Sequence, residues 1–314
     1  MMLSRNLEDP MKNSPSVALP FALVLMLASC HDTPSQPNST PLFQVSGAPT
    51  VVRTLAEWQS AIANAEIGGK IIVHGTIELS RGEEAFLGVA DVTILAATTG
   101  SGLRGVLDGD GVGPFCLICL GPTADGATVQ GLTLDGTLSG RSSSSTSDAA
   151  PLRAAVSGGP LTGVTFRDNL IVCDVGCGVH VFFNNAPDGT FQDNVLMGHP
   201  EFSAIQLQGS SHRMRVIHNW VENAGPNGGI RIRGGNDQLV VDNTIASADR
   251  NGIFTTAFRG TIRDNKILAI TGAATPSCFD GTTGSETAGT ANTWIDNQAP
   301  VPSNPVGICG PITP

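Results

Sequence analysis

Between residues 162 and 267 the sequence repeats a tripeptide that ends in asparagine: Arg167-Asp168-Asn169, Gln192-Asp193-Asn194, Ile217-His218-Asn219, Val241-Asp242-Asn243 and Arg263-Asp264-Asn265. The five asparagines recur at nearly constant intervals along the chain. A repeat of about 20–50 residues is typical of solenoids, in which each repeat supplies one turn of a stacked structure.

The residues around each asparagine indicate which kind of solenoid this is. An apolar residue lies three positions before each asparagine and another lies two positions after it: Phe166 and Ile171, Phe191 and Leu196, Val216 and Val221, Val240 and Ile245, and Ile262 and Ile267. Apolar residues at this spacing do not share one face of a helix, but they fit two short strands joined at a tight corner. A third apolar segment precedes each of the last four asparagines, as in Val179-His180-Val181 and Ile230-Arg231-Ile232. Three short strands per turn predict a parallel β-helix.

Asparagine is well suited to such a corner, because it tolerates left-handed backbone and forms local hydrogen bonds. When the turns stack, each asparagine amide can also bond the amide one turn away, so that no buried polar group is left unpaired. The pattern resembles the right-handed β-helix proteins of the pectate lyase superfamily over roughly residues 50–300. The resemblance implies an all-β fold, a right-handed parallel β-helix (a solenoid).

Composition changes divide the chain into four segments: a lipoprotein signal peptide (1–30), a disordered tether rich in Pro, Ser and Thr (31–49), the β-helix (50–271) and a last turn with a C-terminal cap (272–314). The stretch Leu27-Ala28-Ser29-Cys30 follows a short apolar run and looks like a bacterial lipoprotein signal, in which Cys30 carries the lipid. An ordinary cleaved signal is the alternative. We therefore expect a membrane attachment through the lipid, in the cell envelope at the outer membrane or the cell surface.

Three further segments have local predictions. Thr54-Leu55-Ala56-Glu57 matches a helix capping box, which predicts a short N-terminal helix, to about Ala65, that covers the first turn. The Ser-rich residues 140–147 predict a loop inserted into one turn. Trp294-Ile295-Asp296-Asn297 predicts a last, imperfect turn.

The charge of the chain restricts its partners. The 314 residues carry a formal net charge of −10, with an isoelectric point of about 4.9. An acidic chain argues against nucleic acid as a partner, although it leaves room for a local basic groove. We expect a monomer without a cofactor, with calcium as the one cofactor left open.

Six cysteines remain when Cys30 is set aside: Cys116, Cys119, Cys173, Cys177, Cys278 and Cys309. An even number in an exported protein permits disulfides. Cys173 and Cys177 flank one turn, and Cys278 and Cys309 are placed to pin the C-terminal cap. Cys116 and Cys119 belong to one apparent strand, where residues three apart lie about 10 Å from each other on opposite faces, too far to bond without a bend. The pairing stays open.

The third strand of each turn carries the candidate ligand-binding side chains. Strand alternation places two columns of them on the outer surface. The first column is His180, Gln206, Arg231 and Phe254, and the second is Phe182, Gln208, Arg233 and Thr256. Arg231 and Arg233 are expected about 7 Å apart on one face, which is unfavourable unless an anion lies between them. That anion is either a carboxylate of a neighbouring loop (Glu222, Asp237 or Asp249) or an acidic ligand.

The segment Gly228-Gly229-Ile230-Arg231-Ile232-Arg233-Gly234-Gly235 looks like the Gly-Ile-Arg segment of the alginate lyase and chondroitinase B group. The resemblance implies β-elimination in a uronate polysaccharide on this strand face. The reaction needs positive charge at the carboxylate, a base for the C5 proton and an acid for the leaving oxygen. The assigned residues are Arg231, Arg233 and His180 for catalysis, and Gln206, Gln208, Phe254 and Phe182 for substrate binding.

The chain departs from the related enzymes at several points. They use a lysine base, but no lysine occurs between Lys70 and Lys266, and their Arg-His-Gly motif is absent. The two columns also lack the carboxylates of calcium-dependent pectate lyases, and the three-aspartate set of polygalacturonases is not recognisable. Two functions stay open: a surface-anchored protein that acts on or binds anionic polysaccharide through a lyase-like site, and a non-catalytic β-helix that binds glycan or serves as a surface scaffold.

Overall fold

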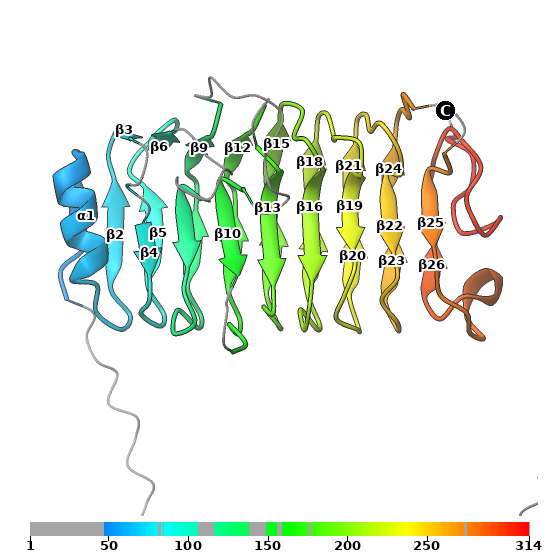
Figure 1. Cartoon of the computed structure of the whole chain (residues 1–314), viewed down its shortest axis with the longest axis horizontal. Coiled ribbons are helices and arrows are strands. Elements are labelled where there is room, and N and C mark those ends of the chain that lie inside the picture. Colours follow the sequence, from blue (N-terminus) through cyan, green and yellow to red (C-terminus); the bar gives the residue numbers. More distant parts are fainter. Residues whose placement is uncertain are drawn as a thin grey trace, which may run out of the picture. The chain divides into compact units, whose positions relative to one another are not determined.

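A computed structural model describes residues 47–80, 83, 85–105, 116–137, 149–155, 159–174, 177–272 and 275–313. The expected signal peptide, Cys30, most of the expected tether and the Ser-rich residues 140–147 lie outside these ranges. Within them the chain is an all-β solenoid of parallel strands, as predicted, with one short α-helix (Figure 1). No helix among the described residues is long and apolar enough to cross a membrane.

The described strands form three parallel sheets of ten, eight and eight strands, and each turn adds a strand to each sheet in succession. Sheet A consists of β1 (Thr50–Val52), β2 (Lys70–Val73), β5 (Thr93–Ala96), β8 (Thr128–Gln130), β11 (Thr165–Arg167), β14 (Thr190–Gln192), β17 (Arg215–Ile217), β20 (Leu239–Val241), β23 (Thr261–Arg263) and β26 (Thr293–Ile295). Sheet B consists of β3 (Thr76–Leu79), β6 (Gly102–Gly105), β9 (Thr133–Asp135), β12 (Leu170–Val172), β15 (Val195–Met197), β18 (Trp220–Val221), β21 (Thr244–Ile245) and β24 (Lys266–Ile267). Sheet C consists of β4 (Ala85–Leu87), β7 (Ile118–Leu120), β10 (Leu152–Ala155), β13 (Val179–Asn184), β16 (Ser203–Gln208), β19 (Gly228–Ile232), β22 (Ile253–Thr255) and β25 (Cys278–Asp280).

The apolar residues on either side of each asparagine form the core. Those of sheets A and B point inward and are fully buried, as Phe166 and Ile171 are in one turn and Phe191 and Leu196 are in the next. Each pairs with its counterpart one turn away, so the core consists of columns of similar side chains parallel to the solenoid axis. The predicted strand–corner–strand unit is therefore confirmed.

The asparagines form the predicted ladder at the corner between sheets A and B. Each Nδ2 donates to Oδ1 of the asparagine one turn further on, at 2.8–3.0 Å, from Asn169 through Asn194, Asn219, Asn243 and Asn265 to Asn297. The same Oδ1 atoms accept a backbone N–H at 3.0–3.1 Å. Asn297 follows β26, so the expected last turn belongs to the ladder.

The left-handed backbone at this corner belongs to the residue before each asparagine, not to the asparagine itself. Asp168, Asp193, His218, Asp242 and Asp264 all have φ between 54° and 59°. These side chains point outward, whereas the asparagines are buried. The expectation that asparagine supplies the left-handed residue was wrong, because its amide is needed inside the ladder.

Both described ends of the solenoid are capped. At the N-terminal end, α1 (Leu55–Ala63) has the predicted capping box and buries Trp58 against the first turns. At the C-terminal end, Asp280 is buried and accepts hydrogen bonds from Trp294 Nε1 and Asn292 Nδ2 at 2.8 and 3.0 Å. A disulfide between Cys278 and Cys309 ties the last residues to sheet C.

The other two disulfides lie at the start of strands of sheet C. Cys173 and Cys177 are bonded to each other, one of the pairings that the sequence allowed. Cys116 and Cys119 are also bonded, which contradicts the expected strand over residues 115–120. Strand β7 begins only at Ile118 and the chain bends before it, so the two Cα atoms lie 5.6 Å apart.

The ladder predicts a large cost for removing an interior amide. In Asn219→Ala, the backbone N–H and Nδ2 of Asn194 lose their acceptor, and Asn243 and the carbonyl of Phe191 lose a donor. We expect the free energy of unfolding to fall by about 1–3 kcal/mol. Urea denaturation monitored by circular dichroism measures this. Arg215→Ala is the control, because this side chain is exposed on β17; equal losses in the two variants would contradict the role of the ladder.

Candidate functional site

The register of sheet C aligns one outward residue from each strand into a single column. In order along the axis this column consists of Phe86, Cys119, Arg153, Phe182, Gln206, Arg231, Phe254 and Phe279. The predicted alignment of Gln206, Arg231 and Phe254 on successive strands is confirmed. Phe182 occupies the place that the sequence assigned to His180, and Asn184 stands beside Gln208 in the second column, where Phe182 was expected.

The displacement of His180 and Phe182 has a simple origin. Strand β13 is longer than expected, and its residue Val181, not Val179, pairs with Ile205. The prediction aligned the first apolar residues of the two strands, which shifts the register by two positions. A register error of two residues preserves the alternation of side chains along a strand. It therefore changes which turn-to-turn partners His180 and Phe182 have, but it does not by itself turn an outward side chain inward.

His180 is buried inside the turn and does not belong to the outer surface. Its side chain is inaccessible to solvent, and Nε2 lies 2.7 Å from the carbonyl oxygen of Met197. Burial lowers the pKa of the imidazole from 6.5 to about 4, because the charged form loses its hydration. His180 is therefore neutral at pH 7 and cannot meet a polysaccharide, contrary to its predicted role as acid or base.

The phenylalanines of the column support arginines and leave little room for a sugar. The Arg231 guanidinium lies over the Phe254 ring at 5.4 Å, and the Phe279 ring stacks on Phe254 with centroids 5.0 Å apart and planes at 5°. Both faces of Phe254 are thus covered, which contradicts sugar stacking on that ring. Phe182 is almost fully buried and lies beneath the Arg153 guanidinium at 5.4 Å. Each pair is a cation–π contact that fixes the direction of a charge.

Two glutamines continue this surface on β16. The Gln206 amide donates to Gln208 Oε1 at 3.0 Å and its own oxygen accepts from Ser203 Oγ at 3.4 Å. Gln206 is only 2% exposed. Its amide is therefore already hydrogen-bonded within the protein, while Gln208, further along the strand, is the more accessible of the two predicted substrate-binding glutamines.

Three arginines gather at β19 and its neighbours without a counterion among the described residues. Arg231 lies in β19, Arg233 directly follows this strand, and Arg250 lies in the loop before β22. Burial lowers the pKa of the Arg231 guanidinium, and the charges of Arg233 and Arg250 lower it further. It still titrates far above pH 7, because an arginine is protonated throughout the physiological range.

Two of the three carboxylates that were expected to neutralise this cluster are paired with other residues. Asp237 forms a bidentate ion pair with Arg259 at 2.7 and 2.9 Å. Asp249 accepts from His199 at 2.9 Å and from Thr271 at 2.8 Å. In the described part of the chain Glu222 makes no ion pair with Arg231 or Arg233. The internal-anion alternative is therefore wrong for these carboxylates, and no carboxylate in the described ranges pairs with the cluster.

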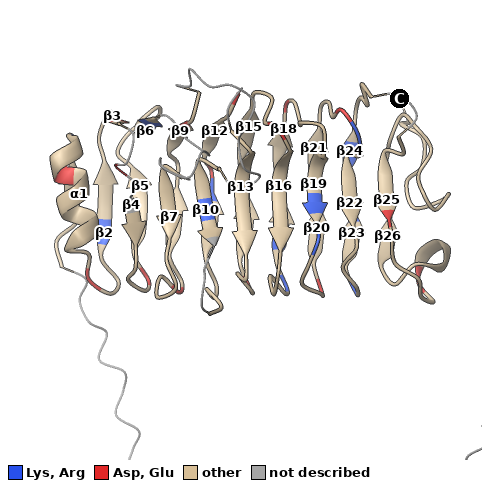
Figure 2. Ribbon diagram, viewed as in Figure 1, with Lys and Arg blue, Asp and Glu red and all other residues tan. Residues whose placement is uncertain are grey.

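Sequence reasoning missed two of the basic residues. Arg153 belongs to β10, whose sequence lies outside the asparagine repeat, and Arg250 belongs to a loop whose approach to Arg231 depends on the stacking of turns. In Figure 2, β10 and β19 of sheet C carry basic residues, whereas β13 and β16 between them carry no charge. Arg153 stands 16 residues before Asn169, whereas the column residues of the next four turns stand 11 to 13 residues before their asparagines, so the repeat does not point to Arg153.

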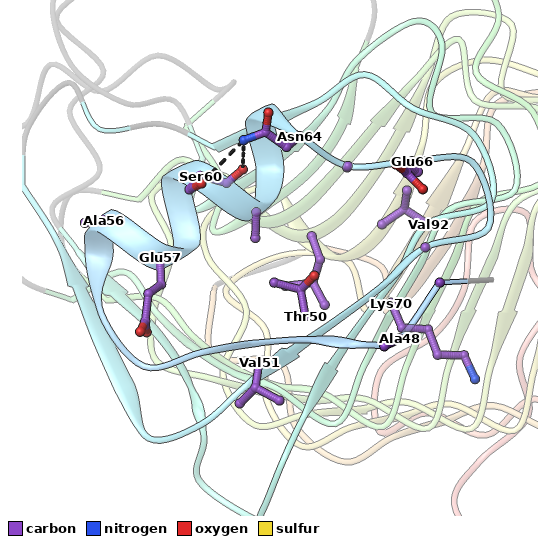
Figure 3. Close-up of a pocket in the computed structure, with 15 residues that line it drawn as sticks. Ala48, Thr50, Val51, Ala56, Glu57, Ser60, Asn64, Glu66, Lys70 and Val92 are labelled. Atoms are coloured by element: carbon purple, nitrogen blue, oxygen red, sulfur yellow. Dashed lines mark hydrogen bonds between the residues drawn. The ribbon is translucent and has the colours of Figure 1, made fainter.

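A separate cavity of about 660 Å³ lies beneath the capping helix (Figure 3). This helix lies at the N-terminal end of the solenoid, several turns away from β19 (Figure 1). Its polar lining is largely occupied: Glu57 completes the capping box, and the Asn64 amide donates to Ser60. In the described ranges, no three His, Cys, Asp or Glu side chains gather in a way that could hold a metal ion. The arginine face of sheet C therefore remains the better candidate.

The comparison with protein-family models agrees with the fold. Residues 157–298 match the family model described as a right handed beta helix region. No curated protein matches the chain. Among solved structures, the A-module of the mannuronan C-5 epimerase AlgE4 from Azotobacter vinelandii aligns with 81% of this chain and 96% of that module, at 15% identity and a TM-score of 0.30. The function is therefore inferred from the side chains of this chain.

The burial of His180 predicts a pH-dependent stability. Because its pKa is about 4 in the folded protein and 6.5 when exposed, the unfolded state binds the extra proton as the pH falls from about 6.5 to 4. The full stabilisation is present above pH 6.5, and about 3 kcal/mol of it is lost at pH 4 and below. We expect His180→Gln to abolish this part of the dependence in urea titrations between pH 7 and pH 4.

Other groups also titrate in this range, so the measured quantity is the difference between the variant and the wild type. His218→Gln is the control, because His218 is exposed at the ladder corner. If the wild-type and His180→Gln curves ran parallel between pH 7 and pH 4, the imidazole would not be the buried neutral group that the structure shows.

Proposed function

We propose that sheet C binds an anionic polysaccharide and that Arg231, Arg233 and Arg250 hold a uronate carboxylate. The observation that carries the proposal is this cluster of arginines without a counterion among the described residues, on a chain of net charge −10. Placing like charges together is unfavourable, and a carboxylate between them removes the repulsion. A guanidinium can also bind a carboxylate through two parallel hydrogen bonds, which a single ammonium group cannot.

The packing of Arg231 favours binding with a small entropic cost. Its guanidinium rests on Phe254, which is held in turn by Phe279. A side chain that is already fixed loses less conformational freedom when it engages a ligand than a free arginine does. Its partial burial also strengthens the attraction, because less water lies between the charges.

The column suits a ligand that extends along the solenoid axis. Successive turns lie about 4.8 Å apart, close to the length of one sugar unit in a polysaccharide. Arg153 lies three turns before Arg231 in the same column. A polysaccharide that follows the column can therefore present a carboxylate to Arg231 while it extends over the neighbouring turns, whereas a neutral glucan has no charge to offer the arginine cluster.

Localisation is a second proposal, carried by the sequence alone. We infer that Cys30 is lipid-modified and that the chain acts at the outer surface of a membrane in the cell envelope. Polysaccharide binding by sheet C suits a protein in that place, where anionic glycans are accessible.

The binding proposal predicts a selective and salt-sensitive affinity. Wild-type protein should bind alginate or pectate more tightly than a neutral glucan, and the affinity should fall as the salt concentration rises. Arg233→Ala should cost about 1.5–3 kcal/mol of binding free energy, the scale of a hydrogen bond to a charged group. Isothermal titration calorimetry with defined oligosaccharides measures both effects.

Arg259→Ala is the matched control, because it removes one positive charge from the same solenoid but from an ion pair with Asp237. Its affinity for the oligosaccharides should stay close to that of the wild type. Equal binding by the wild type and the Arg231→Ala/Arg233→Ala double variant would show that these arginines form only a solvated strand face.

The anchoring proposal predicts that Cys30→Ala releases the protein from the membrane. Metabolic labelling with an alkyne fatty acid, followed by membrane fractionation, checks this in cells that express the full chain. Cys119→Ala is the control for the loss of a cysteine, since Cys119 lies in sheet C. An unlabelled, freely soluble wild-type protein would contradict the lipid anchor.

A further inference from the structure

A second cavity, of about 490 Å³, lies on the outer face of sheet A near its N-terminal end. It is bounded by outward side chains of four successive strands, β2, β5, β8 and β11, and by Pro49, which precedes β1. Binding sites for small molecules have volumes of about 300–1,000 Å³. The polysaccharide binding proposed for sheet C uses none of the residues that line this cavity.

The register of sheet A explains why the surface is hollow here. One outward column begins with the long side chain of Lys70 and continues with the short side chains of Thr93 and Thr128. The neighbouring column ends, at the far side of the cavity, with the long side chains of Gln130 and Arg167. The threonines therefore form a low floor between longer side chains. Lys70 and Arg167 belong to strands three spacings apart, about 14 Å.

The charges around the cavity are all positive. Among the described residues two cations line it and no carboxylate does. In the described part of the chain, neither Lys70 nor Arg167 belongs to an ion pair. Two positive groups that face one cavity without a counterion favour an anionic ligand between them.

Hydrogen bonds direct one of these cations toward the cavity. Arg167 donates from Nη2 to Gln130 Oε1 at 2.8 Å, and Gln130 Nε2 donates to Asp168 Oδ2 at 3.3 Å. Gln130 lies one turn before Arg167. The guanidinium therefore reaches back over β8, which is the side on which the cavity lies, and its other N–H groups are left for a ligand. Asp168 orients Gln130 but does not line the cavity.

The number of cations favours a phosphate group over a carboxylate. A phosphate monoester carries a charge of about −1.5 to −2 at pH 7 and has three acceptor oxygens. It can accept two parallel hydrogen bonds from Arg167 and a further one from the Lys70 ammonium. A single carboxylate would neutralise only one of the two side chains.

The rest of the lining suits a sugar. The hydroxyls of Thr93 and Thr128 can donate hydrogen bonds to sugar hydroxyls or accept hydrogen bonds from them. Both side chains are only partly buried. Ile72 and Leu95, which are also partly exposed, supply an apolar surface beside them for the C–H groups of a ring.

We propose that this cavity binds a phosphorylated sugar, with the phosphate between Lys70 and Arg167 and the sugar over Thr93 and Thr128. It is a second site on another sheet and does not depend on the polysaccharide binding of sheet C. The same chemistry occurs in a soluble sugar phosphate and at the phosphorylated end of a glycan.

The alternative is a hollow with solvated charges and no ligand, and the chain offers a matched control for it. Arg215 is exposed on β17 in the same column as Lys70, but it lies outside the cavity. Its replacement by alanine changes the net charge as much as the loss of Lys70 or Arg167 does. An effect of overall charge would therefore appear in all three variants, and an effect of the cavity in only two.

The test is isothermal titration calorimetry of full-length protein with glucose 6-phosphate, glucose and inorganic phosphate in separate titrations. We expect glucose 6-phosphate to bind at least tenfold more tightly than either of the other two. Arg167→Ala should raise its Kd by about 10- to 100-fold, the scale of a hydrogen bond to a charged group. Arg167→Lys should recover part of this loss, since it restores the charge without the paired hydrogen bonds. Arg215→Ala should bind as the wild type.

Thr128→Val is a milder variant, because it removes a hydroxyl and keeps a β-branched residue that suits a strand. It should raise the Kd for glucose 6-phosphate and leave that for inorganic phosphate unchanged. Tighter binding of a maltotriose phosphorylated at one end than of glucose 6-phosphate would assign the site to a glycan end, and equal binding would assign it to the soluble sugar phosphate.

The proposal is overturned if glucose 6-phosphate binds no better than glucose or inorganic phosphate, or if Lys70→Ala and Arg167→Ala both keep the wild-type Kd. It is also overturned if the Arg231→Ala/Arg233→Ala double variant loses the binding of glucose 6-phosphate, because the phosphate would then sit on sheet C. None of these results changes the binding of alginate or pectate, which is measured separately and tests the proposed function.

Discussion

The hydrogen bonds between successive asparagine amides are the constraint on which the rest of the structure depends. Each asparagine amide bonds the amide one turn away, so the chain segment between two successive asparagines has to form one full turn, however many residues it contains. The register of sheets A and B follows directly, because the strands of sheet A end and those of sheet B begin next to the ladder. Loops of varying length absorb the differences between one interval and the next. Sheet C, further from the ladder, is where functional side chains can vary without disturbing the stack.

The separation of sheet C from the asparagine ladder also explains which features the sequence could predict and which it could not. The repeat was sufficient for the fold, because buried amides and apolar neighbours leave a strict pattern. The repeat was insufficient to align the strand of His180. The number of residues from Val179 to the next ladder asparagine is larger than the number from Ile205, Ile230 or Ile253 to theirs. Starting from Val181 gives a spacing within the range of the others, and this comparison would have corrected the register. The burial of His180 itself depends on how the chain enters β13, for which the sequence has no comparable signal.

The site depends on contacts between turns that no single repeat contains. Whether Phe254 is a sugar platform or a support for Arg231 is decided by the ring of Phe279, one turn away. Whether Asp237 neutralises Arg233 or Arg259 depends on where it lies in the stack of turns, and it lies next to Arg259 and pairs with it. Sequence reasoning named the correct residue types in both cases, since Arg, Phe and Asp are all present in the right turns. It could not assign the partners, because these are fixed by stacking.

The distribution of charge follows from the same architecture. At one corner, Arg213 pairs with Asp188 and Arg259 pairs with Asp237, so that acid and base alternate along the axis and neutralise each other. Hydrogen bonds from these arginines hold the pKa of both carboxyls below its usual value, which keeps the pairs charged over a wide pH range. The cluster of Arg231, Arg233 and Arg250 has no such partner among the described residues. A solenoid can therefore be acidic as a whole and still present one positive patch, because dissolved salt screens exposed charges that lie more than about 10 Å apart, so the charges near a site and not the net charge of the chain set its potential.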